Sequence, residues 1–99
     1  MNLQQLMKQA QSMQKNMLES KKKIESKIYE ETTELVDIKM NGKKMLTEVI
    51  IKNKEEIEKD DLEMLEDMLM IAVNNAMEKI NKDINDSMGS QAGAFDSFL

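Results

Sequence analysis

The chain has 99 residues, of which 40% are hydrophobic and 33% charged, and its formal net charge is −5. This length fits a single domain. There is no cysteine, so no disulfide can form, which fits a reducing compartment. No apolar run approaches the roughly 20 residues that span a bilayer, and the first residues lack the charged-then-apolar leader of a secretory signal. We therefore expect a cytoplasmic protein.

Residues 3–26 are predicted to form one long amphipathic helix. Its apolar residues alternate at spacings of three and four, which is the heptad pattern of a helix that packs along its length against another helix. The sequence leaves open whether that partner is the second helix of the same chain or a helix of another subunit. We call this row the seam; only Ser20 in it is polar, and it consists of Leu3, Leu6, Ala10, Met13, Met17, Ser20 and Ile24.

The face opposite the seam carries lysines seven residues apart. Residues 1–27 hold six lysines and two glutamates, whereas residues 60–99 hold two lysines and nine acidic residues. The first helix is therefore where a polyanion would bind, since lysine and amide side chains contact phosphate and sugar without demanding a base sequence. A merely solvated helix face is the alternative interpretation. The candidate DNA-binding residues are Lys8, Gln11, Lys15, Lys21, Lys22 and Lys23.

The pattern changes from helix to strand after Ser26. Residues 27–33 form a short β-prone run, residues 35–40 alternate between apolar and charged side chains, and Asn41-Gly42 is a strong hairpin signal. Residues 45–52 are the returning strand, in which Ile50 breaks the alternation. The predicted apolar faces are Val36, Ile38 and Met40 on one strand, and Met45, Thr47, Val49 and Ile51 on the other.

A second long helix is predicted to start at Asp60-Asp61 and to end near Met88-Gly89. The six consecutive apolar residues Met68–Val73 are expected to be buried on most sides or to face a second subunit. The predicted architecture is thus an α+β fold of order α-β-β-β-α, with a three-stranded antiparallel sheet. Residues 1–88 form the domain, and residues 89–99 form a flexible tail. With three aromatic residues in the chain the core is thin, which favours an oligomer.

Three segments resemble the YbaB/EbfC family of bacterial nucleoid-associated proteins. They are LMKQAQSMQKNM at Leu6–Met17, LVDIKMNG at Leu35–Gly42 and MLEDMLMIAVNNAMEKI at Met64–Ile80. The resemblance implies a tweezer-like homodimer with projecting helices. It also implies binding of double-stranded DNA, a role in nucleoid organisation or gene expression, and no catalysis.

The residues themselves also argue against an enzyme or a cofactor site. The chain lacks histidine and cysteine and has no glycine-rich phosphate loop, so no catalytic or cofactor-binding constellation is present in the sequence. Eleven methionines raise the question of a soft-metal site, but without histidine or cysteine beside them they are better explained as core packing. We expect no catalytic residue, no metal and no cofactor.

These observations predict a cytoplasmic, nucleoid-associated homodimer that binds DNA mainly through the phosphate backbone. The alternative is a protein-interaction adaptor or small chaperone without DNA binding, which the seam, the methionine-rich interior and the aromatic tail would also suit. The sheet and the Met68–Val73 stretch are expected to form the dimer interface. Its candidate residues are Val49, Ile51, Met68, Leu69, Ala72, Val73 and Ala76.

Overall fold

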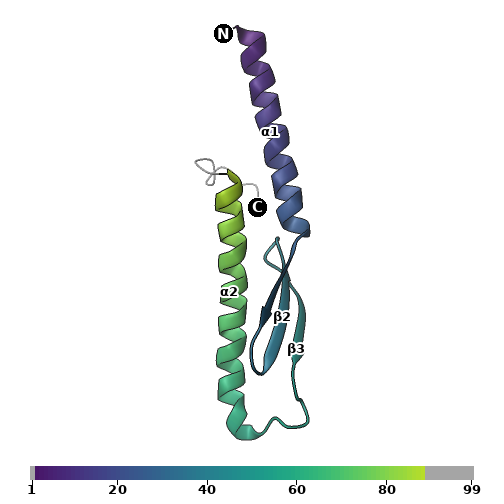
Figure 1. The fold of residues 1–99 in the computed structure, drawn as a ribbon, viewed down its shortest axis with the longest axis vertical. Coiled ribbons are helices and arrows are strands. Elements are labelled where there is room, and N and C mark those ends of the chain that lie inside the picture. Colours follow the sequence, from purple (N-terminus) through teal and green to yellow (C-terminus); the bar gives the residue numbers. More distant parts are fainter. Residues whose placement is uncertain (1, 89–99) are drawn as a thin grey trace.

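The computed structural model describes residues 2–88 as two long helices and a small sheet (Figure 1). The elements are α1 (Leu3–Ser26), β1 (Ile28–Thr32), β2 (Val36–Asn41), β3 (Leu46–Ile51), the 3-10 turn η1 (Lys59–Asp61) and α2 (Leu62–Met88). This order confirms the predicted α-β-β-β-α protomer, including the bounds of the first helix. The tail predicted for residues 89–99 lies outside the described residues.

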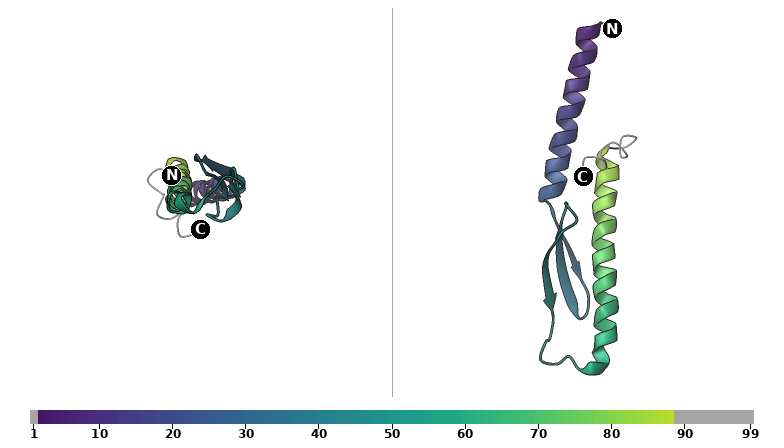
Figure 2. Two further views of the ribbon diagram at one scale, coloured as in Figure 1. Left: turned by 90° about the horizontal axis from the view of Figure 1, so that it is seen from below. Right: turned by 180° about the vertical axis from the view of Figure 1, so that it is seen from behind.

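Helix α1 extends well beyond the rest of the protomer. Asn2 caps its N-terminus by accepting a hydrogen bond of 2.9 Å from the Gln5 amide on its side-chain oxygen, and Lys27 is the single residue between the end of α1 and β1. The described chain measures 70 × 19 × 16 Å, and the upper part of α1 stands clear of α2 (Figures 1 and 2). We call this projecting part, residues 3–17, the arm.

The three strands form an antiparallel sheet in the order β1-β2-β3. Ile38 lies opposite Val49, and Val36 lies opposite Ile51, so here the predicted apolar faces of the two strands are paired. A bulge between Lys39 and Met40 then shifts the register, so Leu46 lies opposite Met40. The face predicted for the returning strand is therefore wrong beyond the bulge, because an inserted residue exchanges the two faces of a strand.

Helix α2 covers one face of β1 and β2 and runs alongside the sheet (Figure 2). Its small Ala72 and Ala76 are buried, which allows close approach to the fully buried Val36 and Ile38 of β2. Strand β3 lies outside this cover and is exposed along nearly its whole length. The core of described residues consists of Ile24, Tyr29, Val36, Ile38, Met40, Ala72, Ala76, Ile80 and Ile84.

The apolar stretch Met68–Val73 is not buried on most sides within the protomer. Met68 and Val73 are partly buried against the core, but Met70 and Ile71 are 58% and 53% exposed. Consecutive helical residues point in different directions, so a helix that contacts a sheet on one side cannot bury six in a row. The other alternative, that this stretch faces a second subunit, stays a prediction.

The predicted hairpin at Asn41-Gly42 is present, and packing against α1 explains the glycine in its loop. The loop comprises residues 42–45, and the left-handed conformation is adopted by Lys44, with a φ of 66°. A Cβ on Gly42 would overlap the carbonyl group of Ile24 and lie 2.9 Å from the Cα of Glu25. Gly42 therefore permits the loop to lie against the last turn of α1.

We expect Gly42→Ala to lower the free energy of unfolding by about 1–3 kcal/mol, because the added methyl must displace backbone rather than a flexible side chain. Urea denaturation measures this change. Lys43→Ala in the same loop is the control. It removes only the exposed Lys43–Glu25 ion pair (3.9 Å), which contributes about 1 kcal/mol or less. Equal stability of wild type and Gly42→Ala would refute the close packing.

Candidate nucleic-acid interface

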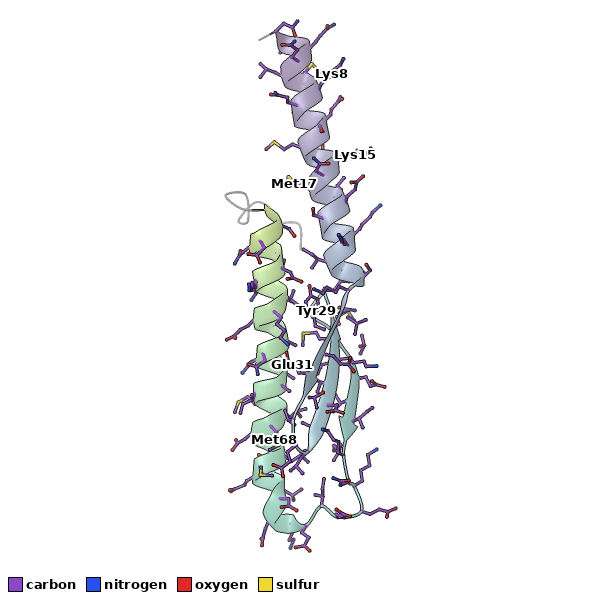
Figure 3. All side chains as sticks on the ribbon, in the orientation of Figure 1. Lys8, Lys15, Met17, Tyr29, Glu31 and Met68 are labelled. Atoms are coloured by element: carbon purple, nitrogen blue, oxygen red, sulfur yellow. The ribbon has the colours of Figure 1, made fainter. Side chains whose placement is uncertain are left out.

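The lysines predicted to bind DNA lie along α1. Lys8, Lys15 and Lys22 are exposed and, at seven-residue intervals, repeat about every 10 Å along the helix. None of the three forms an ion pair with any residue between 2 and 88. Lys8 and Lys15 belong to the arm (Figure 3). Their ammonium groups are thus available to an external anion.

Part of this row borders an open groove on the surface of α1. Gln11, Lys15 and Lys22 contribute to it, so the structure brings three of the predicted residues to one surface. The half-exposed Leu18 also lines it, as does Glu19, the one acidic residue among its lining side chains. Amide and ammonium groups on one face suit the spaced phosphates of a nucleic acid backbone.

The other predicted lysines lie near the base of α1. Lys21 forms an ion pair with Glu25 at 3.7 Å, and Glu25 also lies 3.9 Å from Lys43 of the hairpin loop. Lys23 is exposed in the last turn of the helix. The charge of Lys21 is therefore partly neutralised within the protomer, whereas Lys23 resembles the three lysines of the row in its exposure.

A polar cluster fastens the base of α1 to α2. The Lys27 ammonium lies 2.8 Å from a carboxylate oxygen of Asp83, and the Tyr29 hydroxyl donates a hydrogen bond of 2.6 Å to the same oxygen. The Lys27 ammonium also lies 4.9 Å from the centre of the Tyr29 ring, within the range of a cation–π contact. These contacts link the junction between α1 and β1 to the upper half of α2 (Figure 3).

The cluster shifts the pKa values of the Tyr29 hydroxyl and the Asp83 carboxyl in opposite directions. Burial raises the pKa of the Tyr29 hydroxyl above its ordinary value, and its hydrogen bond to the Asp83 carboxylate raises it further. Hydrogen bonds from Lys27 and then Tyr29 lower the pKa of Asp83, and they outweigh the desolvation that opposes them. At neutral pH the cluster is therefore an ammonium and a phenol held around one carboxylate.

Sequence reasoning missed this cluster. Lys27 and Tyr29 are separated from Asp83 by more than fifty residues, and no local pattern connects them. The available signal was Asp83 itself, an acidic residue next to the apolar Ile80 and Ile84 on the same helix. An acidic residue beside a buried helix face often has a partner on the element that the face covers.

The residues predicted for the dimer interface fall into two groups. Val49 is 47% exposed on β3, and Ile51, Met68, Leu69 and Val73 are half-buried at the margin of the core. Ala72 and Ala76 are buried within the protomer and pack against its own sheet. The first group has surface left for a partner, whereas the two alanines already have contacts in the chain.

Comparison with known proteins gives a consistent result over nearly the whole chain. The sequence profile of the YbaB/EbfC DNA-binding family matches residues 1–95. A nucleoid-associated protein of Ligilactobacillus salivarius is 38% identical over 91 residues, which are 90% of this chain and 86% of that protein. One of Enterococcus faecalis is 33% identical over 99 residues, covering 98% and 94% of the two chains. One of Legionella pneumophila is 43% identical over 83 residues, covering 82% and 72%.

The chain belongs to the YbaB/EbfC DNA-binding family. This confirms the resemblance seen in the three sequence segments, and it agrees with the prediction of a DNA-binding protein that is not an enzyme. Within residues 2–88 the YbaB/EbfC fold holds no group of three or more side chains suited to a metal ion. None of the helices described is long and apolar enough to cross a membrane.

Replacement of Asp83 by asparagine tests the cluster at the base of α1. At pH 7 we expect Asp83→Asn to lower the free energy of unfolding by about 1–3 kcal/mol, because two donors lose their charged acceptor. A carboxylate with a lowered pKa stabilises the fold above its ordinary pKa of 3.8, and this contribution disappears as the pH falls below that value. The difference between the two proteins should therefore shrink between about pH 5 and about pH 2.

Urea denaturation at a series of pH values gives this difference directly. Asp86→Asn is the control, since Asp86 is an exposed acid on the same helix and its change should cost little. A wild-type advantage over Asp83→Asn that stays constant down to about pH 2 would show that the carboxylate charge is not what stabilises the cluster.

Proposed function

We propose that this chain is a nucleoid-associated protein of the cytoplasm that binds double-stranded DNA as a homodimer, chiefly through phosphates along α1. Membership of the YbaB/EbfC DNA-binding family supports the proposal that the chain binds DNA. The names of its relatives support its association with the nucleoid. The carrying observation within the molecule is the row of exposed lysines Lys8, Lys15 and Lys22, which form no ion pair with residues 2–88. In this role the protein organises DNA and influences gene expression without catalysis.

The arrangement of charge along the molecule supports an anionic ligand despite the net charge of −5. Residues 2–18 contain two lysines and no acidic residue. Helix α2 ends close to the level of Met17 (Figure 3), and Lys8 lies nine residues, or about 14 Å, farther along α1. This separation exceeds the Debye length of about 8 Å at physiological salt, so the acids of α2 are largely screened from the tip of the arm.

The exposed edge of the sheet supports the homodimer. Strand β3 has no neighbour on its outer side within the described residues, and a free edge with apolar side chains readily pairs with another chain. Val49 and Ile50 are 47% and 42% exposed there. A partner seated over β3 would cover this apolar surface and double the number of lysine rows.

Binding through phosphates predicts a strong dependence on salt. The affinity of the wild type for a DNA duplex should fall steeply with rising salt, with a log–log slope of about 0.9 for each phosphate that the protein neutralises. The double variant Lys8→Glu/Lys15→Glu should bind at least about tenfold more weakly at low salt. Its slope should be smaller by about 1 for each lysine that no longer binds a phosphate. Fluorescence anisotropy at several salt concentrations measures both quantities.

The control for this experiment is Lys54→Glu/Lys59→Glu, which changes the net charge by the same amount in the exposed connector before α2. It should retain most of the wild-type affinity. Equal weakening in the two double variants would mean that net charge matters rather than the lysine row. Wild-type affinity that does not respond to salt would refute phosphate-directed binding. Absence of any DNA binding at low salt, with capture of a stoichiometric protein partner, would instead favour the adaptor function.

Substitution on β3 tests the homodimer separately from DNA binding. We expect Val49→Lys to shift the molar mass measured by light scattering from that of a dimer towards that of a monomer, because a charge would be buried at the pairing edge. Thr32→Lys is the matched control, since Thr32 is exposed on the opposite edge strand. A wild-type protein that is monomeric at all concentrations would contradict the proposal, as would dimers unaffected by Val49→Lys.

A further inference from the structure

The arm carries an apolar patch that the described residues leave open. Leu3, Leu6 and Met7 are 72%, 50% and 55% exposed, and Ala10 beside them is exposed as well. We call these four residues the arm patch. Lower on the same helix the seam turns towards the protomer, where Ile24 is buried in the core and Met17 packs against it. The upper seam thus continues the heptad pattern of a packed helix, but within residues 2–88 the arm patch is left exposed.

We infer that the arm patch is the docking site for the C-terminal segment of the same chain, residues 89–99, with Phe95, Phe98 and Leu99 as its anchors. This goes beyond DNA binding and does not depend on it. The segment has the composition such a contact needs, since it holds two of the three aromatic residues of the whole protein. Its anchors are spaced i, i+3 and i+4, the spacing that places side chains on one face of a helical turn.

The segment follows the end of α2, which lies near the level of Met17 at the lower end of the arm. The described part of α2 ends at Met88, close to the level of Met17 on α1 (Figure 3). From Met17 to Leu6 the distance along the helix is about 16 Å. The seven residues from Met88 to Phe95 span up to about 23 Å when extended. Phe95 can therefore reach the arm patch without any change in the described fold.

Charge also favours this occupant. Residues 89–99 contain one charged side chain, Asp96, whereas residues 2–18 contain only the positive charges of Lys8 and Lys15. A helix from a second copy is a poorer match. Helix pairs are specified by charged residues beside the seam, and the positions flanking the upper seam are uncharged, namely Met7, Gln9, Gln14 and Asn16.

Docking on the seam side leaves the lysine row accessible. Lys8 and Lys15 project from the face opposite the seam, so a segment bound at Leu6 and Ala10 would not cover them. It would instead cover an exposed apolar patch near the tip of the helix. Unprotected, such a patch promotes association between molecules.

A spin label in the segment tests the contact in the full-length chain. The protein has no cysteine, so Ser97→Cys provides a single attachment site. In isotope-labelled protein we expect the spin label to reduce the peak intensities of the Leu6, Met7 and Ala10 amides by more than half. The peak intensities of the β3 amides should not change. The same label on Ser87→Cys, an exposed site on the last turn of α2, calibrates the broadening produced by a fixed position.

The matched control is Phe95→Ser/Phe98→Ser in the Ser97→Cys background. In this variant the arm signals should recover most of the intensity that they have without the spin label. Broadening that survives these changes would overturn the proposal, as would its absence from residues 3–10 in the first place. Mixing isotope-labelled protein with spin-labelled, unenriched protein separates the two possible sources. Broadening of the arm signals in that mixture would mean that the segment docks on another copy, and would overturn docking within the chain, which predicts no broadening there.

Discussion

The direction of α1 depends on a junction of one residue. Lys27 alone separates the end of α1 from β1, so the contacts around that residue set where the arm points. Asp83 holds Lys27 and Tyr29 from one side, and the loop at Gly42 presses on the last turn of the helix from the other. Helix α1 is about 36 Å long, so a rotation of about 10° at its base would move its tip by about 6 Å. That exceeds the rise of about 3.4 Å between base pairs, so in the proposed complex the base of the arm would control which phosphates the lysines reach.

The net charge taken by itself argues against DNA as a ligand of this chain. The way in which the charges are distributed along the molecule removes this objection. The net charge of −5 is a sum over a molecule 70 Å long, which is several times the Debye length at physiological salt. A phosphate near the arm interacts with Lys8 and Lys15 and is screened from the acids at the start of α2. Glu19 and Glu25 lie closer, and Glu25 is itself engaged by Lys21 and Lys43. In the proposed complex the acidic remainder would therefore lower the affinity of the arm for DNA without abolishing it.

The sequence was sufficient for features that repeat along the chain. Heptad spacing predicted α1 to the residue, and alternation at Val36, Ile38 and Met40 predicted the buried face of β2. Features that depend on contacts between distant segments were missed. These features are the bulge after Lys39, the close approach of Gly42 to Ile24 and the hydrogen bond from Tyr29 to Asp83. Each joins residues that share no sequence periodicity. The Met68–Val73 stretch shows the same limit, since only the position of the sheet decides that Met70 faces outwards.

The protomer leaves apolar surface at two separate places, and their chemistry differs. The edge of β3 offers unpaired backbone groups as well as exposed side chains such as Val49, so its natural partner is another strand or the same edge of a second copy. The arm patch offers side chains alone, because the backbone hydrogen bonds of a helix are satisfied internally. A short segment with two aromatic side chains can cover it without supplying backbone pairing. The proposed pairing at β3 and the proposed docking at Leu6 would therefore be independent events, and a protein that lost one would retain the surface for the other.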